Sequence, residues 1–197
     1  MSPLAVAVFC CLLAGQSFAA SIGLFSSPDC STSNVCIPAG QMDTLYIRAS
    51  TDGLPDDQYF TAAEFRITGL PEGWSTFSTP ESNTFAVGDP FGLGASINFG
   101  FSQLGSCIAL YTVIVLAVSE AYDIGLVVTH ISPPGDPTMP CPRINVICSA
   151  RPCDISYCVE GGLLSINSTI DCKVMVSQRT WSRVKALYKE GAPHESR

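Results

Sequence analysis

The chain has 197 residues, of which 17 are acidic and 10 basic, for a net charge of −7, and 47% are hydrophobic. A chain of this length fits one domain with a substantial core. The acidic balance argues against nucleic acid as a partner, because phosphate binding needs a basic face.

Residues 1–19 predict a removable secretion signal. An apolar run extends from Pro3 to Gly15, and the small residues Ser17 and Ala19 stand at positions −3 and −1 of a cut after residue 19, which is the pattern that signal peptidase cleaves. The run is too short to cross a bilayer, which takes about 20 apolar residues. We therefore expect a secreted protein (periplasmic, cell-surface or extracellular) without a transmembrane anchor.

Cysteine usage supports export. Eight of the ten cysteines lie outside the signal, namely Cys30, Cys36, Cys107, Cys141, Cys148, Cys153, Cys158 and Cys172. An even number in an exported chain indicates a disulfide framework. The four cysteines from Cys141 to Cys158 lack the paired C-x2-C spacing of a zinc site, so we predict neither a metal nor a cofactor. Separation along the chain predicts that Cys30 pairs with Cys36 and that the four cysteines from 141 to 158 pair among themselves, which leaves Cys107 for Cys172.

Alternating apolar and polar residues predict β-strands along most of the chain. The alternation is clear in residues 44–50, 62–70 and 96–101. Residues 109–118 are apolar on both faces, which predicts a central strand covered on both sides. Shorter strands are expected at 124–131, 144–148, 157–160, 162–167 and 172–176.

Turn signals separate these strands, for example at residues 69–73, 88–90 and 161–162. No long helical period occurs before residue 177. The spacing therefore predicts an all-β protein: a single antiparallel β-sandwich over residues 20–176, closed by disulfides and followed by a short C-terminal helix in residues 177–197.

The sequence carries no G-x-S-x-G, H-E-x-x-H, P-loop or G-x-G-x-x-G motif. His130 ends a strand pattern and is expected to be structural. Asp52, Asp56 and Asp57 are interpreted as a solvated loop, with calcium binding through their oxygens as a second interpretation. Together with Glu72 they keep open the alternative of a secreted glycoside hydrolase or another carboxylate-dependent hydrolase.

Aromatic side chains are the binding candidates within the domain, because an exposed ring offers a flat apolar surface with a polar edge. We single out Tyr59, Phe60 and Trp74, with Phe77 as a further ring. Trp74 closes the turn "GLPEGW", and its first interpretation is a core anchor. Asn167 opens a formal N-glycosylation sequon, Asn-Ser-Thr.

Several segments together resemble a known family. "TLYIRAST" precedes "FTAAEFRITGLPEGW", the Gly-led apolar strand "GSCIALYTVIVLAV" follows, and "CVEGGLLSIN" comes near the end. This order resembles cohesin-type and related bacterial carbohydrate-binding sandwiches over residues 22–167. The elements "AEFR", "GLP-x-GW" and "CVEGG" are also similar to those of uncharacterised secreted bacterial proteins. The resemblance implies a β-sandwich binding module and transfers no binding residue.

Residues 177–197 differ from the rest of the chain, since they carry five basic and two acidic residues. A helix there places Trp181, Val184, Leu187 and Tyr188 on one apolar stripe, with Arg183, Lys185 and Lys189 beside it. About ten residues are too few for a stable isolated helix. The segment is expected to dock on the sandwich, to act as a recognition or attachment tag, or to bind a lipid surface, and docking is the interpretation we favour. Trp181, Arg183, Lys185 and Tyr188 are therefore included among the binding candidates.

The leading hypothesis from the sequence is a secreted non-enzymatic β-sandwich that binds protein or glycan at the cell surface or outside the cell. The hydrolase described above is the alternative.

Overall fold

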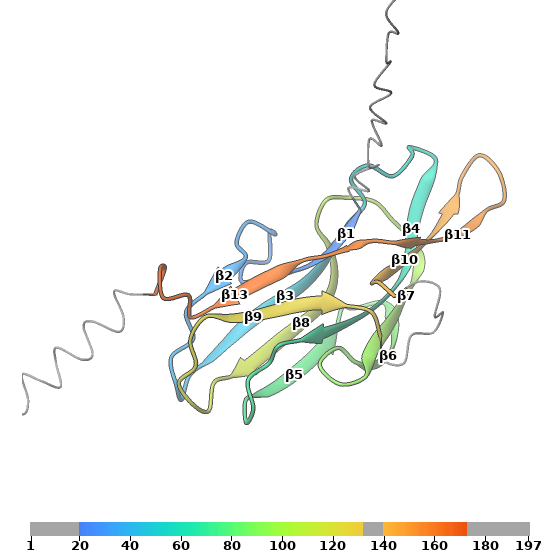
Figure 1. Ribbon diagram of the computed structural model, residues 1–197. Coiled ribbons are helices and arrows are strands. Elements are labelled where there is room, and N and C mark those ends of the chain that lie inside the picture. The colour runs from blue at the N-terminus through green and yellow to red at the C-terminus, as the bar shows by residue number, and fades with distance from the viewer. Residues whose placement is uncertain (1–19, 132–139, 173–197) are drawn as a thin grey trace, which may run out of the picture.

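The computed structural model describes residues 20–131 and 140–172 and forms thirteen β-strands there (Figure 1). In chain order they are β1 (Ser21–Phe25), β2 (Asn34–Val35), β3 (Met42–Ser50), β4 (Gln58–Thr68), β5 (Ser75–Pro80), β6 (Thr84–Asp89), β7 (Gly94–Gln103), β8 (Ile108–Leu116), β9 (Ile124–Thr129), β10 (Arg143–Cys148), β11 (Asp154–Cys158), β12 (Glu160–Gly161) and β13 (Leu163–Ile166). No helix able to span a membrane occurs within these ranges. The predicted signal, most of the strand expected at 172–176 and the C-terminal helix lie outside the described residues.

The strands form two sheets. The first has the order β12-β1-β3-β8-β5. In the second, β4 pairs with β10 along residues 58–64, with β9 along 66–68 and with β7 along 60–65, and the sheet continues through β11, through β13 and β2, and through β6. Within the described ranges, only the short contacts of β1 with β12 and of β2 with β13 are parallel. The predicted all-β sandwich, mainly antiparallel, is confirmed (Figure 1).

The core lies between the two sheets and follows the strand period of two. Leu45 and Ile47 of β3 are fully buried, and so are Phe65 and Ile97 of the second sheet. The rings of Phe65 and Tyr111 meet edge to face with their centroids 6.0 Å apart, which joins β4 to β8 across the layers. Full burial of each such side chain contributes roughly 1.5–3 kcal/mol, so this layer is the main source of stability.

Near its end the chain passes from one sheet to the other. β12 pairs with β1, whereas β13 pairs with β9. Between them, the Gly162 N–H donates to Ile22 O (2.8 Å), and Gly162 O accepts from the Val128 N–H (3.1 Å). A Cβ on Gly161 would lie 2.0 Å from Val128 O. The glycine pair, expected to form a turn, is instead the place where one residue is hydrogen-bonded to both layers.

The eight cysteines of residues 20–172 form four disulfides, and the pairing corrects part of the expectation. Cys30 is bonded to Cys107 and Cys36 to Cys172, so the predicted pairs Cys30–Cys36 and Cys107–Cys172 are wrong. The reason is β2, which pairs with β13 and places Cys36 near Cys172, six residues after the end of that strand. Within the β10–β11 region the bonds are Cys141–Cys158 and Cys148–Cys153, which confirms that these four cysteines pair among themselves.

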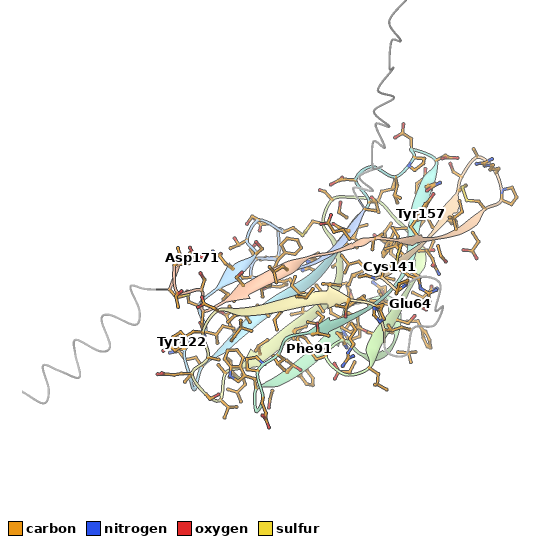
Figure 2. All side chains as sticks on the ribbon, in the orientation of Figure 1. Glu64, Phe91, Tyr122, Cys141, Tyr157 and Asp171 are labelled. Atoms are coloured by element: carbon orange, nitrogen blue, oxygen red, sulfur yellow. A yellow bond between two sulfur atoms is a disulfide. The ribbon has the colours of Figure 1, made fainter. Side chains whose placement is uncertain are left out.

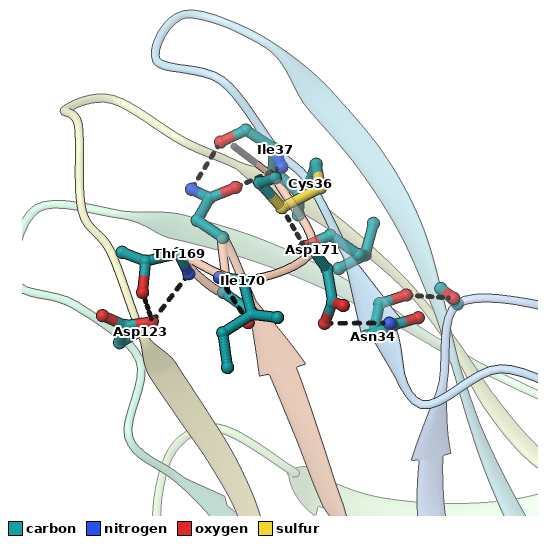
Figure 3. The surroundings of a disulfide bond; sticks show 12 residues. Asn34, Cys36, Ile37, Asp123, Thr169, Ile170 and Asp171 are labelled. Atoms are coloured by element: carbon teal, nitrogen blue, oxygen red, sulfur yellow. Dashed lines mark hydrogen bonds between the residues drawn. A yellow bond between two sulfur atoms is a disulfide. The ribbon is translucent and has the colours of Figure 1, made fainter. Parts of the chain in front are cut away.

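A buried asparagine, Asn167, fixes the chain close to the Cys36–Cys172 bond by binding Ile37, which Figure 3 labels beside Cys36. Asn167 Oδ1 accepts from the Ile37 N–H (2.6 Å), and its Nδ2 donates to Ile37 O and to Ala121 O (2.9 Å each). Asn167 is only 8% exposed. Because both hydrogens of this amide nitrogen are engaged, a glycan on Asn167 is incompatible with the folded corner, and the sequon is a formal match only.

β8 holds the central position predicted for it, between β3 and β5, but the cover expected on both of its sides is incomplete. Its inward residues Val113 and Val115 are fully buried, whereas Ile114 is 42% exposed. Residues 20–131 and 140–172 therefore cover this strand on its inner side and leave its outward side exposed at Ile114.

Candidate functional site

The predicted binding residues within the described ranges do not form one exposed cluster. Phe60 is fully buried, with its ring centroid 5.3 Å from that of Phe99, so its ring is not available to a ligand. Tyr59 is half-buried and pairs with Ile147 of β10, which is exposed. The tail candidates Trp181, Arg183, Lys185 and Tyr188 lie outside the described residues.

Trp74 anchors two loops to each other. It is 6% exposed, and its Nε1–H donates to Ser119 O at 3.1 Å. Gly73 before it has φ 82°, a left-handed conformation that glycine adopts readily. The ring thus holds the turn before β5 against the loop after β8, which agrees with its interpretation as a core anchor.

The carboxylates considered for hydrolysis are split by a long strand. Asp52 and Asp56 are exposed in the loop before β4, and Glu72 is exposed in the turn after it. The eleven residues of β4 span roughly 35 Å at about 3.3 Å per residue. Glycosidase carboxyl pairs lie within about 10 Å, so Glu72 cannot flank one bond together with the loop acids. No cluster of His, Cys, Asp and Glu suited to a metal ion is found in residues 20–131 and 140–172.

The broadest outward surface of the second sheet crosses β6, β7, β4, β10 and β11, and we refer to it as the β4 face. Cross-strand pairing lays two rows of side chains over it: Phe85, Asn98, Ala62, Asn145 and Ser156 in one, and Val87, Ser96, Glu64, Arg143 and Cys158 in the other. Most of these side chains are short. The β4 face is therefore a flat polar floor with one apolar edge.

The apolar edge is β6, whose side chains point opposite to the usual pattern. The small Ala86 pairs with buried Ile97 on the inward side, while Phe85 is 73% and Val87 59% exposed. A Cβ at the neighbouring Gly100 would meet nothing within 4 Å. The two large side chains therefore stand in open space beside the floor. Sequence reasoning missed them, because residues 84–87 are apolar at both parities and do not reveal which side faces the core.

An ion pair occupies the middle of the floor, and Figure 2 labels its acidic member, Glu64. Glu64 on β4 accepts a hydrogen bond from the Arg143 guanidinium on β10, and the two side chains are 29% and 17% exposed. Beside it, Ser156 Oγ–H donates to Asn145 Oδ1 at 2.8 Å. The floor thus offers hydrogen-bonding groups without a net local charge.

No known protein family and no curated protein matches this chain in sequence. Solved structures with a similar arrangement of strands are found. The chain resembles cohesin modules. The seventh type I cohesin of ScaB from Pseudobacteroides cellulosolvens is 9% identical over 76% of this chain and 93% of that one, with a TM-score of 0.49. A non-cellulosomal cohesin from Archaeoglobus fulgidus is 11% identical over 75% of this chain and 90% of that one, with a TM-score of 0.44. A type III cohesin of ScaE from Ruminococcus flavefaciens is 9% identical over 79% of this chain and 91% of that one, with a TM-score of 0.45. This distant similarity agrees with the resemblance to cohesin-type β-sandwiches noted in the sequence.

Proposed function

We propose that this protein is a secreted, non-enzymatic binding module that holds a protein ligand on its β4 face. The observation that carries the proposal is the inversion at β6, where Phe85 and Val87 face solvent and Ala86 faces the core. An edge strand that only closes a sandwich gains stability by turning its large side chains inward. Two large side chains that face solvent, such as Phe85 and Val87, do not contribute this stability unless another surface covers them.

The chemistry of the β4 face suits a protein surface. Covering Phe85 or Val87 fully contributes roughly 1.5–3 kcal/mol each, and a few such anchors supply most of the energy of typical interfaces. The adjoining Asn98, Asn145 and the Glu64–Arg143 pair offer partners for polar groups around that centre. A protein is favoured over a glycan because the branched aliphatic Val87 extends the apolar edge and provides no flat ring for a sugar.

The disulfides support secretion. Four bonds join all eight cysteines of residues 20–172, and such bonds form and persist in oxidising compartments outside the cytosol. Together with the predicted signal at residues 1–19, they favour a location in the periplasm, on the cell surface or outside the cell.

A matched pair of phenylalanines tests the proposal. Phe85 and Phe77 are similarly exposed, at 73% and 68%, and lie on β6 and β5, which belong to opposite sheets. The mature protein is immobilised and used to capture ligands from the envelope of its source cells, and each captured protein is then titrated in pure form. We expect Phe85→Ser to weaken binding at least tenfold, about 1.4 kcal/mol, and Phe77→Ser to leave it unchanged.

Two results would contradict the proposal. Equal weakening by both substitutions would show that the β4 face is not the binding surface. Capture of a polysaccharide instead of a protein would reassign the ligand class, and turnover of that polysaccharide, abolished by Asp56→Asn, would establish the hydrolase alternative.

A further inference from the structure

The outward side of the first sheet, the β8 face, is uncharged in the half near the start of β3. Its outward positions there are Met42 and Thr44 of β3, Ile114 and Leu116 of β8, and Ser75 and Phe77 of β5. Met42 is 69% and Phe77 68% exposed. Large apolar side chains thus lie side by side across three strands. We call this half of the β8 face, formed by these six outward positions, the open half.

The other half of the β8 face is already closed. Arg48 of β3 is 8% exposed, with its guanidinium 5.1 Å from the centroid of the Tyr46 ring and its Nη1 3.8 Å from Glu81 Oε2. Burial lowers the pKa of Arg48, while Glu81 and Tyr46 act in the opposite direction. The only cation on this sheet within the described ranges is therefore buried beside Tyr46 and Glu81, without a hydrogen-bond partner at its Nε or Nη1, and lies away from the open half.

The described region ends at Cys172, within reach of the open half. The Cα atoms of Cys172 and Cys36 are 5.9 Å apart. Cys36 precedes Met42 by six residues, a span of at most about 21 Å, so Met42 lies within roughly 27 Å of Cys172. The Gly40 N–H donates to Ala117 O (2.6 Å), which holds the connecting segment against the end of β8. Asp171 marks this end of the molecule in Figure 2.

Acidic side chains lie at one end of the open half. Glu72 and Glu120 are exposed on the two loops that Trp74 joins, one before Ser75 of β5 and the other after Leu116 of β8. Residues 20–131 and 140–172 together hold fourteen acidic and four basic residues. The surface therefore complements a segment that is apolar on one side and cationic beside it.

We infer that residues 180–189 of the same chain cover the open half of the β8 face as a short helix. Its apolar stripe, Trp181, Val184, Leu187 and Tyr188, packs on Met42, Ile114 and Phe77, and Arg183, Lys185 and Lys189 face the acids at one end of the open half. Ten helical residues are about 15 Å long, and three strands about 4.8 Å apart give a surface of similar width. The nine residues from Cys172 to Trp181 reach up to about 30 Å.

The tether favours this occupant over others. A segment linked to its site has an effective concentration in the millimolar range, which suits a helix too short to form alone. Two copies of the described region carry a net charge of −10 each and repel each other, and an anionic lipid surface is repelled in the same way. The contact uses a different surface from the β4 face and goes beyond the function proposed above.

Hydrogen exchange measured by mass spectrometry on the full mature protein tests the inference. We expect amides of residues 180–189 to be protected in the wild type. Phe77→Lys and Ile114→Lys should speed their exchange at least tenfold by placing cations against the tail, and high salt should speed it in the wild type by screening the acidic contacts. Phe85→Lys on the β4 face is the matched control and should change nothing.

A photo-cross-linking phenylalanine analogue at position 77 gives a second readout, which does not require the folded protein to accept a lysine on the β8 face. It should form an intramolecular link to a peptide within residues 177–190, and the same analogue at position 85 should not. Unprotected tail amides in the wild type, protection unaffected by Phe77→Lys, or cross-links between two copies would each overturn the inference. Capture of a ligand by the β4 face is not affected in any of these cases, so the two proposals fail separately.

Discussion

At the scale of single residues, Asn167 combines two tasks that few side chains can perform together. Its backbone has φ 53°, a left-handed conformation in which asparagine is enriched. Its amide accepts one hydrogen bond and donates two, to backbone groups of two other loops. A side chain must therefore act as donor and acceptor at once to satisfy this corner.

Replacing Asn167 by Asp tests that requirement. The new carboxylate still accepts from the Ile37 N–H, but its second oxygen faces the carbonyl oxygens of Ile37 and Ala121. We expect the free energy of unfolding to fall by about 1–3 kcal/mol, the cost of unsatisfied buried polar groups. Denaturant titration measures it. The control is Asn98→Asp, which carries the same charge change at an exposed position and should cost under about 0.5 kcal/mol.

At the scale of elements, the passage of the chain between the sheets depends on the absence of a side chain at Gly161. A Cβ there would lie 2.0 Å from Val128 O, whereas a Cβ on Gly100 would meet nothing within 4 Å. We expect Gly161→Ala to separate the last strands and lower the melting temperature by well over 10 °C, with loss of cooperative unfolding. Gly100→Ala, the matched control in a strand, should leave the melting curve almost unchanged.

The disulfides differ in how much chain they enclose. From the lost entropy of the unfolded chain, we expect Cys36–Cys172, which spans 136 residues, to stabilise the protein by about 5 kcal/mol. Cys148–Cys153, which spans 5 residues, should stabilise it by about 2 kcal/mol. We expect replacement of both cysteines by serine to destabilise the protein more in the first case than in the second, as measured by denaturant midpoints. Equal losses would show that native contacts around the bonds, rather than loop length, set their contribution.

The elements also show what the sequence could and could not predict. β3, β4, β7 and β8 were predicted because each alternates or is apolar over a long stretch. β5 and β6 were missed, since residues 75–80 hold one large apolar side chain and residues 84–87 do not alternate. The outward position of Phe85 and Val87 depends on the register of β6 with β7, and register is a property of two strands that neither segment specifies alone.

At the scale of the whole molecule, deletion of residues 179–197 tests how far the sandwich is independent of its tail. The two described sheets hold a continuous core and all four disulfides. We expect the truncated protein to fold with its disulfides formed and to lose only a few kcal/mol, because one apolar stripe is removed. Melting and non-reducing peptide mapping check this.

The same deletion separates docking from attachment. If the tail covers the β8 face, the truncated protein should bind more of an apolar fluorescent dye than the full chain. If the tail is a tag, dye binding should stay constant and the protein should leave the cell surface for the medium, which cell fractionation detects.

The passage at Gly162 also sets the order in which the protein can fold. β1 lies between β3 and β12, so its edge at Ser21 and Ile22 stays unpaired until residues 160–161 have been synthesised. Contacts so far apart in sequence close slowly, and an open strand edge invites pairing with another chain. For a chain that crosses a membrane unfolded, the delay is harmless, because the two ends meet only after both have crossed. A nascent chain that stalls before residue 160 is thus expected to aggregate through β1 rather than to form a smaller native-like domain.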